Sequence, residues 1–277
     1  MTVVGFVVHP DRPEATALAE RARAWLHAGG HRTIEVVPPG DPGAPAVAEP
    51  VDLLVSLGGD GTMLRAVEVA TPTGTPVLGV NLGRLGYLTE VEPAGLERAL
   101  TGFLDGVHEV EERMTLSVTL TGPDGTVLDQ RPALNEAVVE KTVPGHTVRV
   151  AVTIDGTPFV TYAADGLLVA TPTGSTVYNL SARGPVVSPR LRAMVVTPVS
   201  PHMLFDRAMV LEPTQRLTLT ILEPRPAVVV VDGSSVAVLA PGSTVTTTAG
   251  ERSARLVTFG TRDFHAILRA KFHLADR

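Results

Sequence analysis

The sequence of 277 residues contains no cysteine. Disulfide bonds, thiolate catalysis and zinc or iron–sulfur centres held by cysteine are therefore excluded. Aromatic residues are also scarce, at 4% of the chain, whereas hydrophobic residues as a whole reach 44%. This is the composition of a globular protein with enough apolar residues for a sizeable core.

The chain also lacks an excess of positive charge, because its formal net charge is −6 at pH 7. General nucleic-acid binders and proteins of anionic membrane surfaces are basic, so neither partner is expected. No apolar run approaches the length of a membrane span, and residues 1–10 lack the basic start and cleavage site of a signal peptide. We therefore expect a cytoplasmic protein.

Two domains are expected at this length. The first part of the chain alternates apolar strands with helices in the order β-α-β-loop-β-α-β, which favours a doubly wound parallel sheet. The expected strands are 3–8, 33–37, 51–57 and 77–80, the expected helices are 14–28 and 63–70, and a loop rich in Pro, Gly and Ala covers 38–50.

The pattern changes near Val107, where short alternating strands joined by tight turns begin. Asp-Gly pairs at 155–156 and 232–233 stand between such runs and are a strong hairpin signal. We therefore expect an α/β domain over 1–106 and an antiparallel, sandwich-like β domain over 107–254. The remaining segment, 255–277, contains a strand and a helix at 264–272 that are expected to return to the first domain.

Residues 58–62 read Gly-Gly-Asp-Gly-Thr and join a buried strand to a helix. The glycines leave no Cβ in the way of a ligand, and free N–H groups at a helix start favour anions. Asp60 places a carboxylate where phosphate would bind, so it suits a proton acceptor for an attacking hydroxyl or a ligand for a divalent cation. The alternative is a turn made of Gly and Asp because those residues turn well.

A second polar stretch, residues 171–176, reads Thr-Pro-Thr-Gly-Ser-Thr within the β part. We expect it to lead into a helix capped by Ser175 or Thr176. Its hydroxyl and N–H groups suit ribose and phosphate oxygens, although a capped helix start without a ligand explains it equally well.

Two further candidates lie upstream. Asn135 and Glu136 suit ribose hydroxyls, but adjacent polar residues beside an apolar run are more often a strand edge. His146 stands in a Pro-Gly-His turn, where a lone histidine is more often solvated than functional.

Taken together, these blocks resemble those of the bacterial NAD kinases that use ATP or polyphosphate. The Gly-Gly-Asp-Gly-Thr motif alone is shared with diacylglycerol, sphingosine and 6-phosphofructo kinases. The resemblance covers nearly the whole chain and keeps the family order of four blocks, which are 58–62, 81–89, 135–136 and 165–178.

The resemblance implies that Asp60 accepts the proton of a ribose hydroxyl, with Gly61 and Arg65 near the ligands. It also implies that Asn135 and Glu136 hold the nicotinamide-side ribose or neighbouring groups, that His146 contacts ligand and that Asp165 binds the nicotinamide end. The further binding positions that it implies are Thr176, Val177, Tyr178, Asn179, Leu180, Ser181 and Ser234.

Three positions depart from the family pattern. Arg183 stands where the family usually has glycine, so it disfavours any positive φ there and adds a cation. Ser234 stands where the family has glutamine, which shortens or removes that contact. Ala163 stands where some relatives carry a side chain that reaches the ligand.

The implied reaction is phosphoryl transfer from ATP or polyphosphate to the 2′-hydroxyl of the adenosine ribose of NAD. The implied cofactor is Mg²⁺ or another divalent cation, for which no protein ligand is named, and the implied assembly is a homodimer or homotetramer. Two alternatives stay open: a kinase of the same fold with a nucleoside, sugar or lipid acceptor, and a non-catalytic dinucleotide-binding regulator. The sequence chooses neither between ATP and polyphosphate nor between NAD and NADH.

Overall fold

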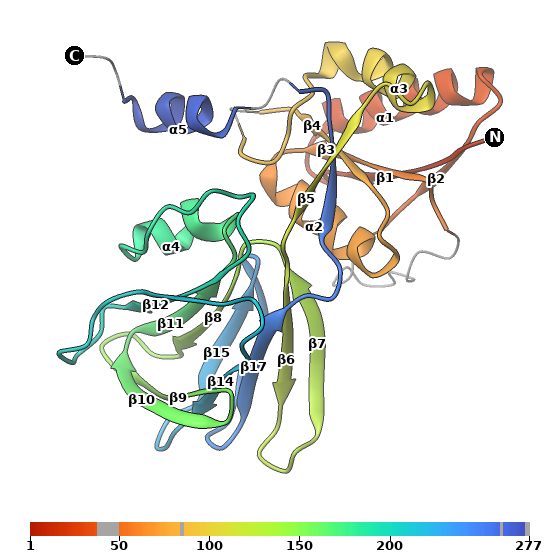
Figure 1. Cartoon of the computed structure of the whole chain (residues 1–277). Helices are drawn as coiled ribbons and strands as arrows, with labels where there is room; N and C mark the ends of the chain where they lie inside the picture. The colour runs from red at the N-terminus through yellow and green to blue at the C-terminus, as the bar shows by residue number, and fades with distance from the viewer. Residues whose placement is uncertain (38–49, 84–85, 261–262, 275–277) are drawn as a thin grey trace. The chain divides into compact units, whose positions relative to one another are not determined.

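The computed structural model describes residues 1–37, 50–83, 86–260 and 263–274. The chain divides into two compact units, Met1–Glu112 with Ala254–Arg277, and Arg113–Ser253 (Figure 1). The loop predicted at 38–50 lies outside the described residues except for Pro50. Within the described part, no helix is both long and apolar enough to cross a membrane.

The first unit contains a six-stranded sheet in the order β2-β1-β3-β4-β18-β5. The pairs β1–β2, β1–β3, β3–β4 and β4–β18 are all parallel, so the predicted parallel α/β arrangement is confirmed. Its strands are β1 (Val3–Val8), β2 (Arg32–Glu35), β3 (Leu53–Gly58), β4 (Val77–Asn81), β5 (Glu109–Arg113) and β18 (Ala254–Thr258).

Helices cover both faces of this sheet (Figure 1). Side chains of α1 and α3, such as Leu18 and Leu100, pack in one cluster with Leu57 of β3. A Cβ at Gly79 would lie 3.1 Å from Met63 Sδ, so α2 covers the other face. The helices are α1 (Pro13–Ala28), α2 (Asp60–Ala70), α3 (Leu96–Leu104) and α5 (Phe264–Phe272), with short 3-10 turns η1 (Thr71–Thr73) and η2 (Pro93–Gly95). Burial on both faces explains the unbroken apolar run of β3.

The second unit contains two six-stranded sheets, in the orders β10-β9-β14-β17-β6-β7 and β13-β12-β11-β8-β15-β16. All their pairings are antiparallel, as expected. The strands are β6 (Leu116–Thr121), β7 (Val127–Ala133), β8 (Glu136–Lys141), β9 (Val148–Ile154), β10 (Thr157–Ala164), β11 (Gly166–Ala170), β12 (Met194–Val199), β13 (Met209–Leu211), β14 (Leu217–Ile221), β15 (Ala227–Val231), β16 (Ser234–Leu239) and β17 (Thr244–Ala249).

The core of this unit lies between the two sheets. Alternate side chains such as Val118 of β6 and Val152 of β9 pack against Val169 of β11, as in a sandwich. The outer face of the second sheet is also covered, because Val187 and Tyr178 pack against Leu168 and neighbouring side chains. The covering segment includes η3 (Gly174–Thr176) and α4 (Tyr178–Ser181). The predicted polar loop is therefore packed onto a sheet.

Candidate functional site

Asp60 is the first residue of α2, directly after β3 and Gly59. Its carboxylate accepts two backbone hydrogen bonds, from Tyr87 N to Oδ2 at 2.8 Å and from Leu88 N to Oδ1 at 3.0 Å. A carboxylate has about four acceptor positions, so two bonds fix its direction and leave it able to accept another hydrogen. Asp60 is half-buried, which keeps it open to a ligand.

Gly86 allows the 81–89 loop to come this close to Asp60. A Cβ at position 86 would lie 2.3 Å from Asp60 Oδ1 and 2.7 Å from Thr89 Oγ1, so any side chain would push the loop away. The backbone of this loop therefore lies directly against the Asp60 side chain. Arg84 and Leu85, which belong to the same block, lie outside the described residues.

Gly61 and Arg65 lie on the exposed side of α2. A Cβ at Gly61 would meet nothing within 4 Å, so a ligand has room to approach the backbone beside Asp60. In the first unit the structure thus places the carboxylate, the open glycine and the arginine on the first two turns of one helix.

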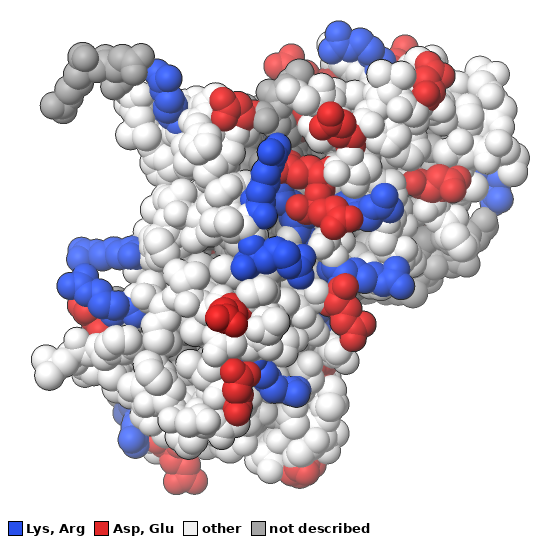
Figure 2. Space-filling view, in the orientation of Figure 1, with Lys and Arg blue, Asp and Glu red and all other residues white. Residues whose placement is uncertain are grey.

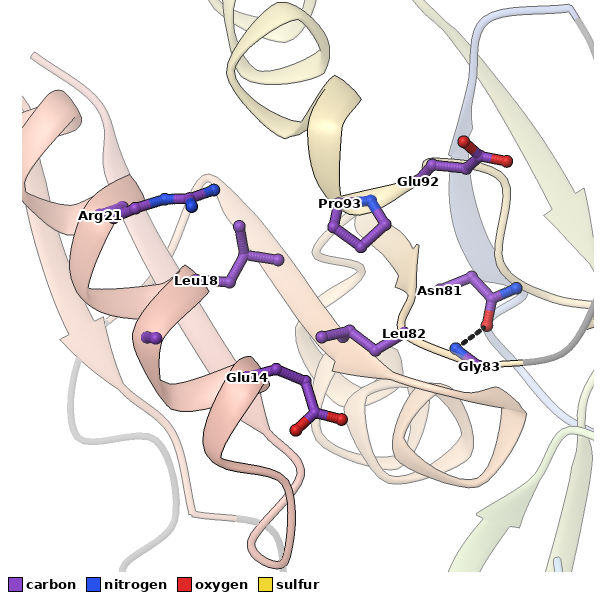
Figure 3. A pocket seen from close by; sticks show the side chains of 9 residues that line it. Glu14, Leu18, Arg21, Asn81, Leu82, Gly83, Glu92 and Pro93 are labelled. Atoms are coloured by element: carbon purple, nitrogen blue, oxygen red, sulfur yellow. Dashed lines mark hydrogen bonds between the residues drawn. The ribbon is translucent and has the colours of Figure 1, made fainter.

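A cavity of about 520 Å³ also lies in the first unit, between α1, the end of β4 and η2 (Figure 3). Leu18 and Leu82 line it, and the Asn81 side chain at its edge accepts a hydrogen bond from Gly83 N at 3.0 Å. The described residues that line it include none of the predicted site residues. The predicted site is therefore not this cavity.

In the second unit, Asp232 holds the backbone of the Asn-Glu motif. Its carboxylate accepts hydrogen bonds from Leu134 N (2.7 Å), Asn135 N (2.7 Å) and Glu136 N (3.1 Å). The Asp-Gly pair at 232–233 forms the β15–β16 hairpin turn, and Asp232 has φ of 47°. The sequence predicted the turn but not the hydrogen bonds between Asp232 and the backbone of residues 134–136, because those residues are nearly a hundred positions away in the chain.

Glu136 is buried, with 5% of its surface exposed, and its Oε2 has no hydrogen-bond partner among the described residues. Burial, with a smaller contribution from the charge of Asp232, raises the pKa of Glu136 to about 8. Glu136 therefore carries a proton through much of the neutral pH range. A buried carboxyl oxygen without a partner is suited to a ligand that supplies the missing hydrogen bond.

The 171–176 loop packs directly on the Asn-Glu motif. Thr171 N donates to Asn135 O at 2.8 Å, and Thr171 Oγ1 donates to Leu134 O at 2.5 Å. A Cβ at Gly174 would lie 2.1 Å from Asn135 O, so only glycine fits there. Two of the four predicted blocks are therefore held together within this unit.

A helix follows the 171–176 stretch as expected, but the predicted capping of that helix by Ser175 or Thr176 was wrong. Residues 174–176 form the 3-10 turn η3, and α4 begins only at Tyr178. Ser175 Oγ donates to Pro172 O (2.7 Å) and accepts from Val187 N (2.9 Å), so it ties two loops together and caps no helix. The Ser175 hydroxyl therefore stabilises the tertiary structure and does not cap a helix.

Residues 176–181, which the resemblance implies as binding positions, differ in exposure. Asn179 is completely buried. Its Nδ2 donates hydrogen bonds to Ser175 O and Pro185 O, and its Oδ1 accepts one from Thr197 Oγ1, so the side chain is committed to the fold. Thr176 is also buried, whereas Tyr178 and Leu180 are half-buried and Val177 and Ser181 are exposed.

Asp165 and Tyr178 belong to one polar cluster with Glu136. Asp165 Oδ1 lies 2.6 Å from Lys141 Nζ, and both side chains are about one-third exposed. Burial raises the pKa of Tyr178 to about 12, with the charge of Glu140, a hydrogen bond to Glu140, and the charges of Asp165 and Glu136 acting in the same direction. The charges of Asp165 and Glu136 are therefore close enough to Tyr178 to influence its ionisation.

The remaining predicted positions lie at exposed turns or edges. His146 is exposed in the turn between β8 and β9, and Ser234 is exposed at the start of β16. Arg183 has φ of 66°, so an arginine occupies a left-handed position that favours glycine.

Comparison with known proteins decides the family. Residues 43–108 match the model of the ATP-NAD kinase N-terminal domain, and residues 134–259 match that of the ATP-NAD kinase C-terminal domain. The chain belongs to the NAD kinase family. An NAD kinase from Heliobacterium modesticaldum is 41% identical over 98% of each chain, and NAD kinase 1 of Streptomyces avermitilis is 36% identical over 100% of this chain and 88% of its own.

Solved NAD kinase structures have the same fold. A yeast NADH kinase complexed with NADH superimposes with a TM-score of 0.89 at 25% identity, covering 100% of this chain and 89% of its own. An NAD kinase from Archaeoglobus fulgidus in complex with ATP superimposes with a TM-score of 0.76 at 27% identity, covering 97% of this chain and 98% of its own. The α/β plus β-sandwich architecture is therefore that of the NAD kinases.

Proposed function

We propose that this chain transfers the γ-phosphoryl group of ATP to the 2′-hydroxyl of the adenosine ribose of NAD, with Asp60 as the proton acceptor. The observation that carries the proposal is the Asp60 carboxylate, which two backbone N–H groups orient beside the open Gly61. The similarity to NAD kinases over the whole chain supports NAD as the acceptor, rather than a nucleoside, a sugar or a lipid.

In this reaction the ribose 2′-oxygen attacks the γ-phosphorus of ATP. The bond from that phosphorus to the β,γ-bridging oxygen breaks, ADP leaves, and Asp60 takes the hydroxyl proton. Phosphoryl transfer needs little covalent help, so the protein contributes alignment, charge neutralisation and proton acceptance. Arg65, on the exposed side of the same helix, is proposed to contact the ligands.

The dinucleotide is proposed to bind the polar cluster of the second unit. Asn135 and Glu136 would bond ribose hydroxyls, and Asp165 would bind the nicotinamide end. Asp232 and the 171–176 loop hold the Asn-Glu backbone in place, so this part of the site is built before ligand arrives. The other proposed contacts come from His146, Thr176, Val177, Tyr178, Leu180, Ser181 and Ser234.

Mg²⁺ is proposed to enter bound to the donor phosphates. Among the described residues no three His, Cys, Asp or Glu side chains converge on one point. Mg²⁺ commonly keeps water and substrate phosphates as ligands beside one or two carboxylates, so MgATP needs no such cluster. When bound, the ion would neutralise phosphate charge.

A homodimer or homotetramer formed through the second unit is also proposed. Apolar side chains exposed on that unit support it, because Leu204 is fully exposed and Phe159 meets Phe205 edge-on at 5.8 Å between ring centroids. Light scattering coupled to size-exclusion chromatography tests it, and a monomer at micromolar concentration would contradict it.

The test of the function is Asp60→Asn, assayed for NADP formation with ATP and separately with polyphosphate. We expect kcat to fall by about 10²–10⁴-fold, the usual contribution of a positioned general base, with nearly unchanged affinity for NAD. Asp105→Asn, which alters an exposed carboxylate beyond α3, is the control. Wild-type kcat in Asp60→Asn would refute the assignment, and NAD binding without turnover in the wild type would support the non-catalytic alternative.

A further inference from the structure

The C-terminal helix α5 carries a lysine to the loop that holds Asp60. Lys271 Nζ lies 3.8 Å from the centroid of the Tyr87 ring. Lys271 is half-buried. The structure describes all nine residues of α5, and none of them is fully buried. The contact of Lys271 with Tyr87 therefore does not follow from a buried hydrophobic face of the helix.

Tyr87 links this ammonium group to Asp60. Its backbone N–H donates to Asp60 Oδ2, and its ring lies beneath Lys271. Burial lowers the pKa of Lys271, and the charge of Asp60 opposes that change. Burial raises the pKa of Tyr87, and the charge of Asp60 adds to it. All three groups therefore lie within electrostatic range of one another.

A phosphoryl donor placed beside Asp60 needs a cation. The Asp60 carboxylate repels phosphate oxygens, and the whole chain has a net charge of −6. On the face shown in Figure 2, basic side chains stand among acidic ones. A local ammonium group is the kind of group that stabilises charge developing on a transferred phosphoryl group.

We propose that Lys271 is a catalytic residue that contacts the transferred phosphate of the donor, with the Tyr87 ring holding its ammonium group ready. A cation over an aromatic ring is held less strongly than one that bonds an anionic oxygen, so the ammonium can turn from the ring to phosphate. This proposal rests on the proposed role of Asp60, because the transferred phosphate must pass beside the residue that takes the hydroxyl proton.

The alternative is that Lys271 only tethers α5 to the loop. A tether and a phosphate contact make different predictions for Tyr87→Leu, which removes the ring but keeps the backbone N–H. A tether would be broken equally by Tyr87→Leu and Lys271→Met. A phosphate contact survives in Tyr87→Leu, because the ammonium group is still present.

The experiment measures kcat and KM for ATP and for NAD in Lys271→Met, Lys271→Arg and Tyr87→Leu. Arg269→Met, which removes an exposed positive charge from the same helix, is the matched control. Thermal melting verifies that each variant folds. We expect Lys271→Met to lose about 10–100-fold in kcat/KM for ATP, as removal of one charged contact to a transition state does, with a smaller change in KM for NAD.

Lys271→Arg should recover most of the lost activity, and Arg269→Met should stay near wild type. Tyr87→Leu should lose clearly less activity than Lys271→Met, because it removes only the ring that holds the ammonium group. Equal losses in Lys271→Met and Tyr87→Leu, or wild-type kinetics in Lys271→Met, would overturn the proposal. The two proposals fail separately. If Asp60→Asn is inactive and Lys271→Met is normal, only the role of Lys271 is overturned. If Asp60→Asn keeps wild-type kcat, the role of Asp60 is overturned, and with it the premise on which the role of Lys271 rests.

Discussion

The Asp232 carboxylate lies 3.1 Å from the backbone nitrogen of Glu136, and its charge helps to keep the Glu136 side chain protonated. One aspartate therefore both positions the Asn-Glu motif and alters its chemistry. The folded protein binds a proton at Glu136 that the unfolded chain releases at lower pH.

Glu136→Gln should therefore change how stability depends on pH. The pKa of Glu136 is about 8 in the folded protein, against 4.5 ordinarily, so the folded state binds more protons between these values. In this window the stability of the wild type falls as pH rises, whereas the amide does not titrate. The variant should gain on the order of 3–5 kcal/mol relative to wild type between pH 4.5 and 8.

Urea unfolding at pH 5 and at pH 8.5 measures this difference. Glu20→Gln, at an exposed position of α1, is the control and should follow the wild type. Parallel stability curves for Glu136→Gln and wild type would show that Glu136 is ionised normally in the folded protein.

Gly86→Ala should impair turnover more than folding. The new Cβ would lie within 2.3 Å of Asp60 Oδ1, so the loop must move and the two N–H bonds to the carboxylate weaken. We expect kcat to fall by about 10-fold or more, because misplacing a catalytic group by about 1 Å is costly. Gly95→Ala, whose Cβ would meet only Val91 Cγ1 at 3.6 Å, should keep wild-type kcat.

Arg183→Gly tests whether the family glycine relieves backbone strain. Position 183 has φ of 66°, which disfavours any side chain with a Cβ. Arg183→Gly should therefore be more stable than Arg183→Ala by about 1 kcal/mol, because both variants lose the cation but only glycine adopts this φ freely. Thermal unfolding of the two variants side by side measures it, and equal melting temperatures would rule out strain at this position.

Lys141→Met should alter the choice between NAD and NADH. The Lys141 ammonium lies 2.6 Å from Asp165 Oδ1 and offsets its negative charge. If Asp165 faces the nicotinamide, removing the lysine favours the cationic ring of NAD over the neutral ring of NADH. The effect should be about 2–5-fold, since the pair is partly exposed.

The measurement is the ratio of kcat/KM for NAD to that for NADH. Asp165→Asn should move this ratio in the opposite direction. A ratio unchanged in both variants would place Asp165 away from the nicotinamide.

The sequence by itself determined the local structure and the main motifs. Buried runs such as Leu53–Gly58, the Asp-Gly turns and the Gly-Gly-Asp-Gly-Thr block depend on residues that are neighbours in the chain, and their spacing specifies a strand, a hairpin or a strand-to-helix turn. The doubly wound sheet, the antiparallel sheets and the candidate Asp60 therefore followed from pattern alone.

Only the tertiary structure decided which side chains hold these motifs. Asp232 grips Asn135 from 97 residues away, the Tyr87 and Leu88 N–H groups orient Asp60, and Lys271 reaches Tyr87 from the end of the chain. Ser175 joins two loops where its local preference was to cap a helix. Local propensity contributes little free energy compared with a network of buried hydrogen bonds between distant segments. No periodicity in the sequence encodes such a network.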